Sequence, residues 1–193
     1  MVLKFNHFLT QQVSQTKRGK DVKKIIVIMF VSMVVVIGFL GLFNYISLEG
    51  KFTKRSHTTL GIEHFEGGNA YYFGYYFRWE GIGSPTIEKV EFIKRDGTIV
   101  TKDDDEFRIQ PFIASSNRIG VLDEETVIKE GILNDLVEVK GFQVDEDFHL
   151  VLRVELDVTN PSKDISSLRV TYKKYGLTQI QSVSFDNGVV TDQ

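Results

Sequence analysis

Histidines and acidic clusters are the residues of this chain whose chemistry suits metal binding. A catalytic zinc ion needs three converging protein ligands, but the chain has four histidines and no cysteine. Only His64 lies near carboxylates, with Glu66 on the same face of an extended segment, and two ligands are too few. The acidic runs 103–106 and 145–147 lack the spacing of a calcium-binding EF-hand loop. We therefore expect solvated turns at these runs, no metal site and no cofactor.

Hydrolytic chemistry has few candidates in this sequence. The chain contains no G-x-S-x-G motif, no cysteine nucleophile and no P-loop. A glycosidase places two carboxyl groups about 5 to 10 Å apart in one concavity. Glu80, Glu155 and Asp157 are the acids that a cell-envelope enzyme acting on wall glycan would use. We expect no catalytic residue, and we keep the envelope enzyme as an alternative.

The aromatic run from residue 71 to 79 is the most suggestive binding feature. On a strand, alternate side chains point to opposite faces, so residues 71, 73, 75, 77 and 79 would form a core ridge. Tyr72, Tyr76 and Arg78 would share the other face, where two tyrosines and an arginine suit a sugar ring or a peptide. Cross-strand packing explains the same residues without a ligand. We state ligand binding by Tyr72, Tyr76 and Arg78 as a hypothesis.

These side chains belong to a chain that is organised by one apolar segment, residues 25–46. At about 1.5 Å of rise per residue the segment reaches about 33 Å, enough to cross a bilayer as a helix. It is longer than the apolar part of a signal peptide, and no A-x-A cleavage site follows it, because the first alanine is Ala70. We expect a retained transmembrane helix that contacts membrane lipid through residues 25–46.

Charge on the two sides of this segment predicts its orientation. Residues 1–24 hold six basic residues and one acidic residue, a net charge of +5, whereas the rest of the chain has 17 basic and 25 acidic residues, a net charge of −8. The positive-inside rule places the N-terminus in the cytoplasm and the C-terminal part outside the cell membrane. An exported domain of this charge repels nucleic acid and favours a cationic partner.

The chain divides into a cytoplasmic tail (1–24), the helix (25–46), a tether (47–68) and one extracytoplasmic domain (69–193). The domain reads as all-β, because residues 148–158 alternate between apolar and polar and Arg95-Asp96-Gly97 is typical of a hairpin turn. Further strands are expected at 87–94, 98–101, 107–114, 118–122, 137–144, 168–174 and 177–185, with Asn160-Pro161 as one of the turns. Residues 123–136 fit either a short helix capped by Asp123 or two strands. This pattern predicts an antiparallel β-sandwich.

The layout of basic tail, single span and cysteine-free β domain resembles small membrane-anchored, immunoglobulin-like extracytoplasmic proteins of Gram-positive bacteria. In that resemblance Trp79 takes the place of the core tryptophan and Tyr172 that of the corner tyrosine. It implies an immunoglobulin-like sandwich and a cell-envelope location. We expect a non-enzymatic, single-pass protein that binds a protein or a cell-wall ligand. The other alternative is an accessory subunit of a membrane transporter or sensor complex.

Overall fold

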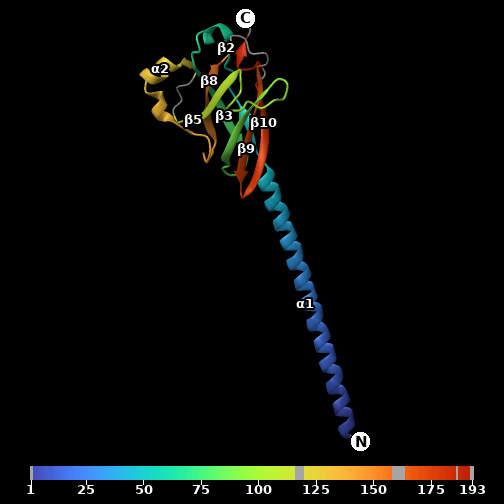
Figure 1. Ribbon diagram of the computed structural model, residues 1–193. Helices are drawn as coiled ribbons and strands as arrows, with labels where there is room; N and C mark the ends of the chain where they lie inside the picture. The colour runs from blue at the N-terminus through green and yellow to red at the C-terminus, as the bar shows by residue number, and fades with distance from the viewer. Residues whose placement is uncertain (1, 116–119, 158–163, 186, 192–193) are drawn as a thin grey trace. The chain divides into compact units, whose positions relative to one another are not determined.

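The computed structural model describes residues 2–115, 120–157, 164–185 and 187–191, with side chains from residue 22 onward. It divides into two compact units, Met1–Ile46 and Ser47–Gln193. The first unit consists of helix α1 (Val2–Leu48), whose last two residues belong to the second unit (Figure 1).

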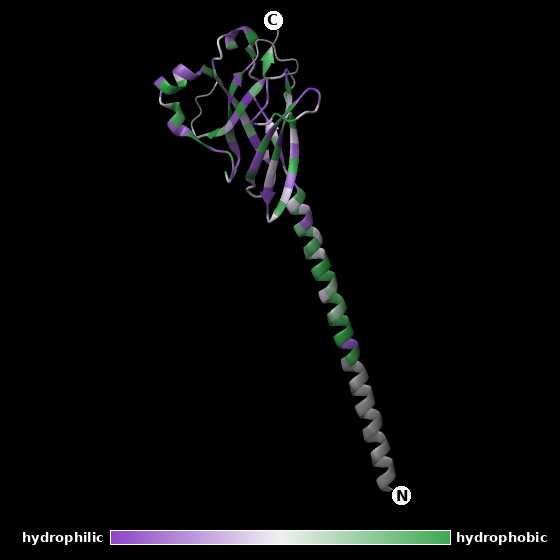
Figure 2. Ribbon diagram, in the orientation of Figure 1, coloured by the Kyte–Doolittle hydropathy of each residue, from purple (hydrophilic) through white to green (hydrophobic). Residues whose placement is uncertain are grey.

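Helix α1 contains the apolar segment that the sequence predicts. Residues Val22–Leu48 are long and apolar enough to span a membrane, and Figure 2 shows this stretch as nearly continuous hydrophobic ribbon. The segment is rich in valine and isoleucine, which are weak helix formers in water. In lipid, however, a helix satisfies every backbone hydrogen bond internally. The expected span is therefore confirmed as a candidate membrane helix, and the side of the membrane stays a prediction.

The second unit is built from two antiparallel sheets that share one core, and it adds a short parallel pair. The first sheet has the order β1 (Lys51–Lys54), β3 (Tyr71–Glu80), β8 (Asp147–Leu156), β5 (Phe107–Ala114) and β7 (Leu136–Glu138), and β6 (Val121–Asp123) also pairs with β3. The second sheet has the order β10 (Leu177–Ser184), β9 (Ile165–Lys174) and β4 (Thr86–Lys94). Strand β11 (Val190–Thr191) pairs in parallel with β2 (Leu60–Gly61), which precedes the 3₁₀ helix η1 (Ile62–Phe65).

The main core forms where the predicted alternation places it. On β3 the buried side chains are Phe73, Tyr75, Phe77 and Trp79, and on β8 they are Phe148, Leu150, Leu152, Val154 and Leu156. The second sheet contributes Leu168, Val170 and Tyr172 from β9 together with Ile87 and Phe92 from β4. The mostly antiparallel β domain with one core is thus confirmed.

Residues 47–68 differ from the expected tether, because they are part of the domain. Strand β1 pairs with the C-terminal end of β3 from Lys51 opposite Glu80 to Lys54 opposite Phe77. Phe52 is 2% exposed, and its ring centroid lies 5.0 Å from that of Trp79 and 5.1 Å from that of Tyr172. Phe52 is a single aromatic residue in a polar stretch, so the alternation of apolar and polar residues is too short to predict a strand there. Its side chain nevertheless anchors β1 in the core.

Residues 123–136 form the capped helix that was one of the two expectations. In α2 (Glu124–Lys129) the Asp123 carboxylate accepts a hydrogen bond from the Thr126 N–H at 2.7 Å, as an N-cap does. The chain then turns at Gly131, with φ of 70°, into the 3₁₀ helix η2 (Ile132–Asp135). These elements cover a second apolar cluster on the outer face of the first sheet: Tyr72, Ala114, Val127, Ile132 and Val151.

Other strands follow the sequence expectations to differing extents. Strand β5 has the predicted bounds, and β4, β8, β9 and β10 match within a few residues. The expected strand 137–144 is reduced to β7, because the chain turns at Gly141 with φ of 84°. Residues 98–101 bond to β4 at two points, from the Lys94 N–H to the Thr98 carbonyl and from the Val100 N–H to the Phe92 carbonyl, both 2.9 Å. Residues 118–119, 158 and the turn at 160–161 lie outside the described residues.

Candidate functional site

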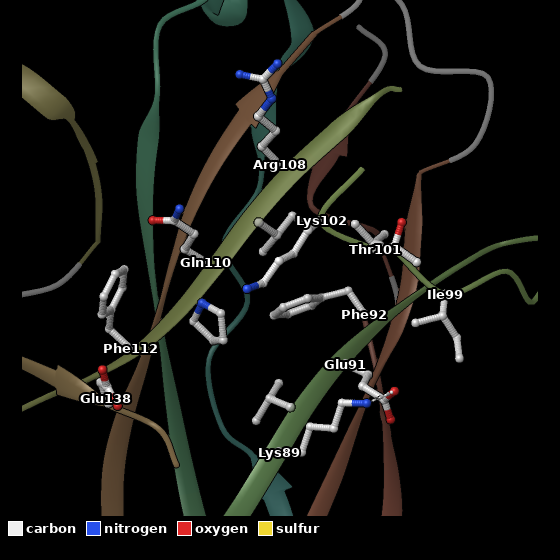
Figure 3. A pocket seen from close by; sticks show the side chains of 14 residues that line it. Lys89, Glu91, Phe92, Ile99, Thr101, Lys102, Arg108, Gln110, Phe112 and Glu138 are labelled. Atoms are coloured by element: carbon white, nitrogen blue, oxygen red, sulfur yellow. Dashed lines mark hydrogen bonds and ion pairs between the residues drawn. The ribbon is translucent and has the colours of Figure 1, made fainter. Parts of the chain in front are cut away.

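A groove lies between β4 of the second sheet and β5 of the first, shown in Figure 3. We call it the β4–β5 groove. Its volume is about 910 Å³, and it is lined by residues 89–92 of β4, residues 108–112 of β5, residues 99–102 and Glu138. A cavity of this size lies within the range of protein binding pockets.

The groove is open because the outer edges of β5 and β4 are only partly paired. Strand β5 pairs with β8 along its whole length, but β7 pairs only with residues 112–114 on its other side. Strand β4 pairs with β9, and its other side is bridged at its two ends, by Gln143 opposite Thr86 and by residues 98–100. Among the described residues no strand pairs with residues 107–111 on this side of β5. The two sheets therefore present facing edges.

Backbone groups of both edges point into the groove. Pro111 of β5 has no N–H to donate, and proline within a sheet is found where its nitrogen faces away from the partner strand. Backbone groups alternate in direction along a strand, so the N–H and carbonyl of Ile109 face the groove as well. On β4 the Phe92 carbonyl accepts from Val100, and by the same alternation the N–H and carbonyl of Val90 face away from β9.

Side chains give the groove an apolar floor and a charged rim. Phe92 is buried in the core, and the half-buried side chains of Val90 and Ile109 pack against that core. At the rim, Lys89 Nζ lies 2.6 Å from Glu91 Oε1, and Arg169 Nε lies 3.0 Å from Glu91 Oε2. The hydrogen bond from Lys89 and that from Arg169 hold the pKa of Glu91 below its usual value despite the opposing effect of burial. The carboxylate stays ionised and fixed beside the floor.

The opposite side of the domain is closed, which makes the groove distinctive. Strands β1 and β10 meet there, and the Gln181 side chain bridges them in place of a backbone ladder. The Phe52 N–H donates to Gln181 Oε1 and Gln181 Nε2 donates to the Phe52 carbonyl, both at 2.7 Å. A single glutamine thus satisfies both backbone groups of Phe52 on that edge.

The structure brings together two of the three residues in the predicted binding platform. Arg78 donates to both oxygens of Asp147, with Nε 2.7 Å from Oδ1 and Nη2 3.0 Å from Oδ2. The hydrogen bond from Arg78, and then that from Tyr76, lower the pKa of Asp147 to about 2. The ring of Tyr76 lies 5.2 Å from that of His149. Tyr76 and Arg78 therefore meet around one carboxylate.

Tyr72 is separated from this pair. It is 4% exposed and lies in the second apolar cluster, beneath α2. Four residues along a strand also span about 13 Å, which sets its ring apart from that of Tyr76. Its burial follows from α2, which the sequence left undecided, so the flat three-residue platform is not formed. Ligand binding by Tyr76 and Arg78 stays a prediction.

Of the three acids weighed for glycan hydrolysis, Glu155 and Asp157 lie close together and Glu80 lies apart from them. Glu80 ends β3 and bonds to Arg55, whereas Glu155 lies at the opposite end of that sheet, near the end of the antiparallel strand β8. Arg108 forms ion pairs with both Glu155, at 3.6 Å, and Asp157, at 2.8 Å. The structure does not bring Glu80 together with the other two acids.

His64 contacts Glu63, which is not the partner that the sequence predicted. Its Nε2 is 3.6 Å from Oε1 of Glu63 in η1, which is a 3₁₀ helix and not the expected extended segment. Within the part of the chain that the structure describes, no three histidine, aspartate or glutamate side chains converge in a geometry suited to a metal ion.

Sequence reasoning missed the β4–β5 groove, although one signal for it was present. Pro111 lies inside the predicted strand 107–114, and an interior proline marks a strand edge. The facing edge of β4 gives no such signal. No protein-family model, no curated protein and no solved structure matches the chain.

Proposed function

We propose that this chain is a membrane-anchored binding protein whose β4–β5 groove takes up an extended segment of a partner protein as an added strand. The observation that carries the proposal is the pair of strand edges, on β4 and β5, that face each other across an apolar floor. Strand addition uses backbone hydrogen bonds for affinity and pockets for alternate side chains for specificity. Both features are available in this groove.

The length of the groove limits the segment that it accepts. Within the described chain no strand pairs with residues 107–111 on the groove side of β5, but the Phe107 N–H donates to Asp104 Oδ1 at 3.0 Å. The free edge therefore covers residues 108–111, which equals about 14 Å of strand at about 3.4 Å per residue. An extended segment of about four residues fits, with alternate side chains directed at Val90, Phe92 and Ile109. We infer that the bound segment has alternating apolar residues and no proline at the positions that donate to Ile109 or Val90.

The wider context of this function rests on sequence. The charge asymmetry supports an N-terminus in the cytoplasm and a domain outside the cell membrane. The two sheets with a common core support a β-sandwich, and its immunoglobulin-like topology is a proposal from the resemblance. We propose a bacterial cell-envelope protein without catalytic activity that acts by holding its partner.

Photo-crosslinking in intact cells tests the groove. A photoreactive amino acid replaces Gln110, an exposed groove residue of β5, in the full chain, and the matched control places it at exposed Ser182 of β10. We expect a specific protein adduct from position 110 and none from position 182. The adducts are then identified by mass spectrometry.

A proline substitution tests the backbone edge itself. Val90→Pro removes an N–H that faces the groove and leaves the hydrogen bonds between β4 and β9 in place. We expect loss of the adduct at position 110 in a protein that still unfolds cooperatively, at a somewhat lower temperature because the Val90 side chain packs against the core. Equal capture from positions 110 and 182, or capture that survives Val90→Pro in a folded protein, would contradict strand addition.

A further inference from the structure

Residues 47–50, which lie at the C-terminal end of the apolar segment and directly after it, are hydrogen-bonded to one end of the domain. The Ser47 carbonyl accepts from Gln179 Nε2 at 2.6 Å, and the Ile82 N–H donates to Glu49 Oε2 at 2.8 Å. The Lys174 ammonium donates to the Glu49 carbonyl. Residues 81–84 and the turn between β9 and β10 therefore pack directly on residues 47–50, within this one compact unit.

Chain geometry keeps this end close to the membrane, whatever the angle between helix and domain. The apolar segment ends at Leu48, and extended chain covers at most about 3.6 Å per residue. Ser47 and Glu49 are each one residue from Leu48. The residues that contact them therefore lie close in space to the end of the span. In a chain that crosses a bilayer at this helix, a surface so placed lies near the headgroup region.

Three large apolar side chains are exposed on this end. Ile82 is 54% exposed, Tyr175 50% and Leu177 41%. The polar turn that a soluble hairpin requires is replaced by Tyr175-Gly176, with φ of 49° for Tyr175 and 85° for Gly176. Asparagine or glycine is usual at the first position of such a turn, and a bulky residue with positive φ is uncommon. Backbone strain of this kind is concentrated at sites with a function.

The loops that carry these side chains are firmly packed. Lys174 is 1% exposed, and its ammonium lies 5.2 Å from the ring of Trp79 and 5.9 Å from that of Tyr175. A Cβ atom at Gly50 would lie 2.3 Å from the Trp79 ring and clash with it, so only glycine allows the backbone to come this close to the indole. The exposed apolar side chains stand on a rigid base.

We propose that Ile82, Tyr175 and Leu177 form a membrane-contact surface that inserts into the headgroup region of the lipid bilayer. Tyrosine favours this region because its ring is apolar and its hydroxyl is polar. The occupant is lipid because the surface is continuous, through residues 47–50, with a segment suited to spanning the bilayer. This inference rests on the span and is independent of the groove.

The absence of cysteine allows a direct test with spin labels. Single-cysteine variants Ile82→Cys, Tyr175→Cys and Leu177→Cys of the full chain are labelled with a nitroxide and reconstituted in phosphatidylcholine vesicles. The matched control is Ile128→Cys, because Ile128 is similarly exposed. It lies on α2, near Tyr71 at the start of β3, whereas Lys51 pairs with the opposite end of β3. Accessibility to oxygen, which concentrates in lipid, is compared with accessibility to a water-soluble nickel reagent.

The two reagents separate lipid contact from other outcomes. We expect labels at positions 82, 175 and 177 to gain oxygen accessibility and lose nickel accessibility relative to position 128. Loss of both would indicate burial against protein and would overturn the proposal. So would nickel accessibility equal to that at position 128. The three positions report independently, and circular dichroism of each variant verifies the fold.

Discussion

Phe52→Ala tests whether the residues directly after the apolar segment belong to the folded domain. Phe52 is 2% exposed and packs edge-on against Phe148 and Tyr172, with ring centroids 5.9 and 5.1 Å away. Truncation of a buried phenylalanine to alanine typically costs about 3 to 5 kcal/mol, through lost burial and the cavity that remains. We therefore expect Phe52→Ala to lower the free energy of unfolding by about 3 to 5 kcal/mol.

The single tryptophan makes this measurement direct. Trp79 lies 5.0 Å from Phe52, so its fluorescence reports unfolding of the contact as well as of the core. Urea titration of the full chain in detergent gives the free energy for the wild type, Phe52→Ala and the control Lys51→Ala. Lys51 is on the same strand but its side chain is 67% exposed, and such surface changes usually stay within about 0.5 kcal/mol. If Phe52→Ala matched Lys51→Ala, residues 51–54 would be a tether and the reasoning would fail.

Three further predictions concern single contacts. Gln181→Ala removes both hydrogen bonds that join β10 to Phe52. Because two buried backbone groups lose their partner, we expect the free energy of unfolding in urea to fall by about 1 to 3 kcal/mol. A change near zero would mean that water replaces the glutamine. The pKa of Asp147 is lowered to about 2 in the folded state, so its stabilising effect is complete above the ordinary value of 3.8 and is lost as pH falls toward 2. Arg78→Gln should flatten the pH dependence of unfolding between pH 4 and pH 2, and an unchanged profile would exclude the pair as its origin. Asp123→Ala removes the cap of α2, which typically costs about 0.5 to 2 kcal/mol, and hydrogen exchange should accelerate in residues 124–129 while β9 stays protected.

Local patterns predicted those parts of the fold that depend on a single strand. The alternation at Phe148 to Leu156 was sufficient to place β8 and its core face, since one face of that strand meets only the core. The same alternation made no prediction for Val151, an apolar residue on the other face that α2 and η2 bury. Burial on that face depends on elements more than 15 residues away, and strand period carries no information about them.

The groove lay beyond sequence reasoning for a related reason. A missing neighbour strand is a property of the assembled sheets, and the residues of β4 look alike whether or not a strand pairs with them. Pro111 was the one local signal, and it restricts β5 alone. Tyr72 shows the same limit, since its place in the alternation was right while its exposure was decided by α2.

The burial of β3 on both faces has a consequence for how this protein tolerates unfolding. Residues 71–77 form seven consecutive positions without a charge or a proline, rich in aromatic side chains, the composition typical of segments that assemble into amyloid-like stacks. In the native state β8 covers one edge, β1 and β6 share the other, and the two apolar clusters cover the faces. Unfolding of α2 would expose the apolar side chains of β3 to other chains. Aggregation should then follow, so thermal unfolding should be irreversible and faster at higher protein concentration.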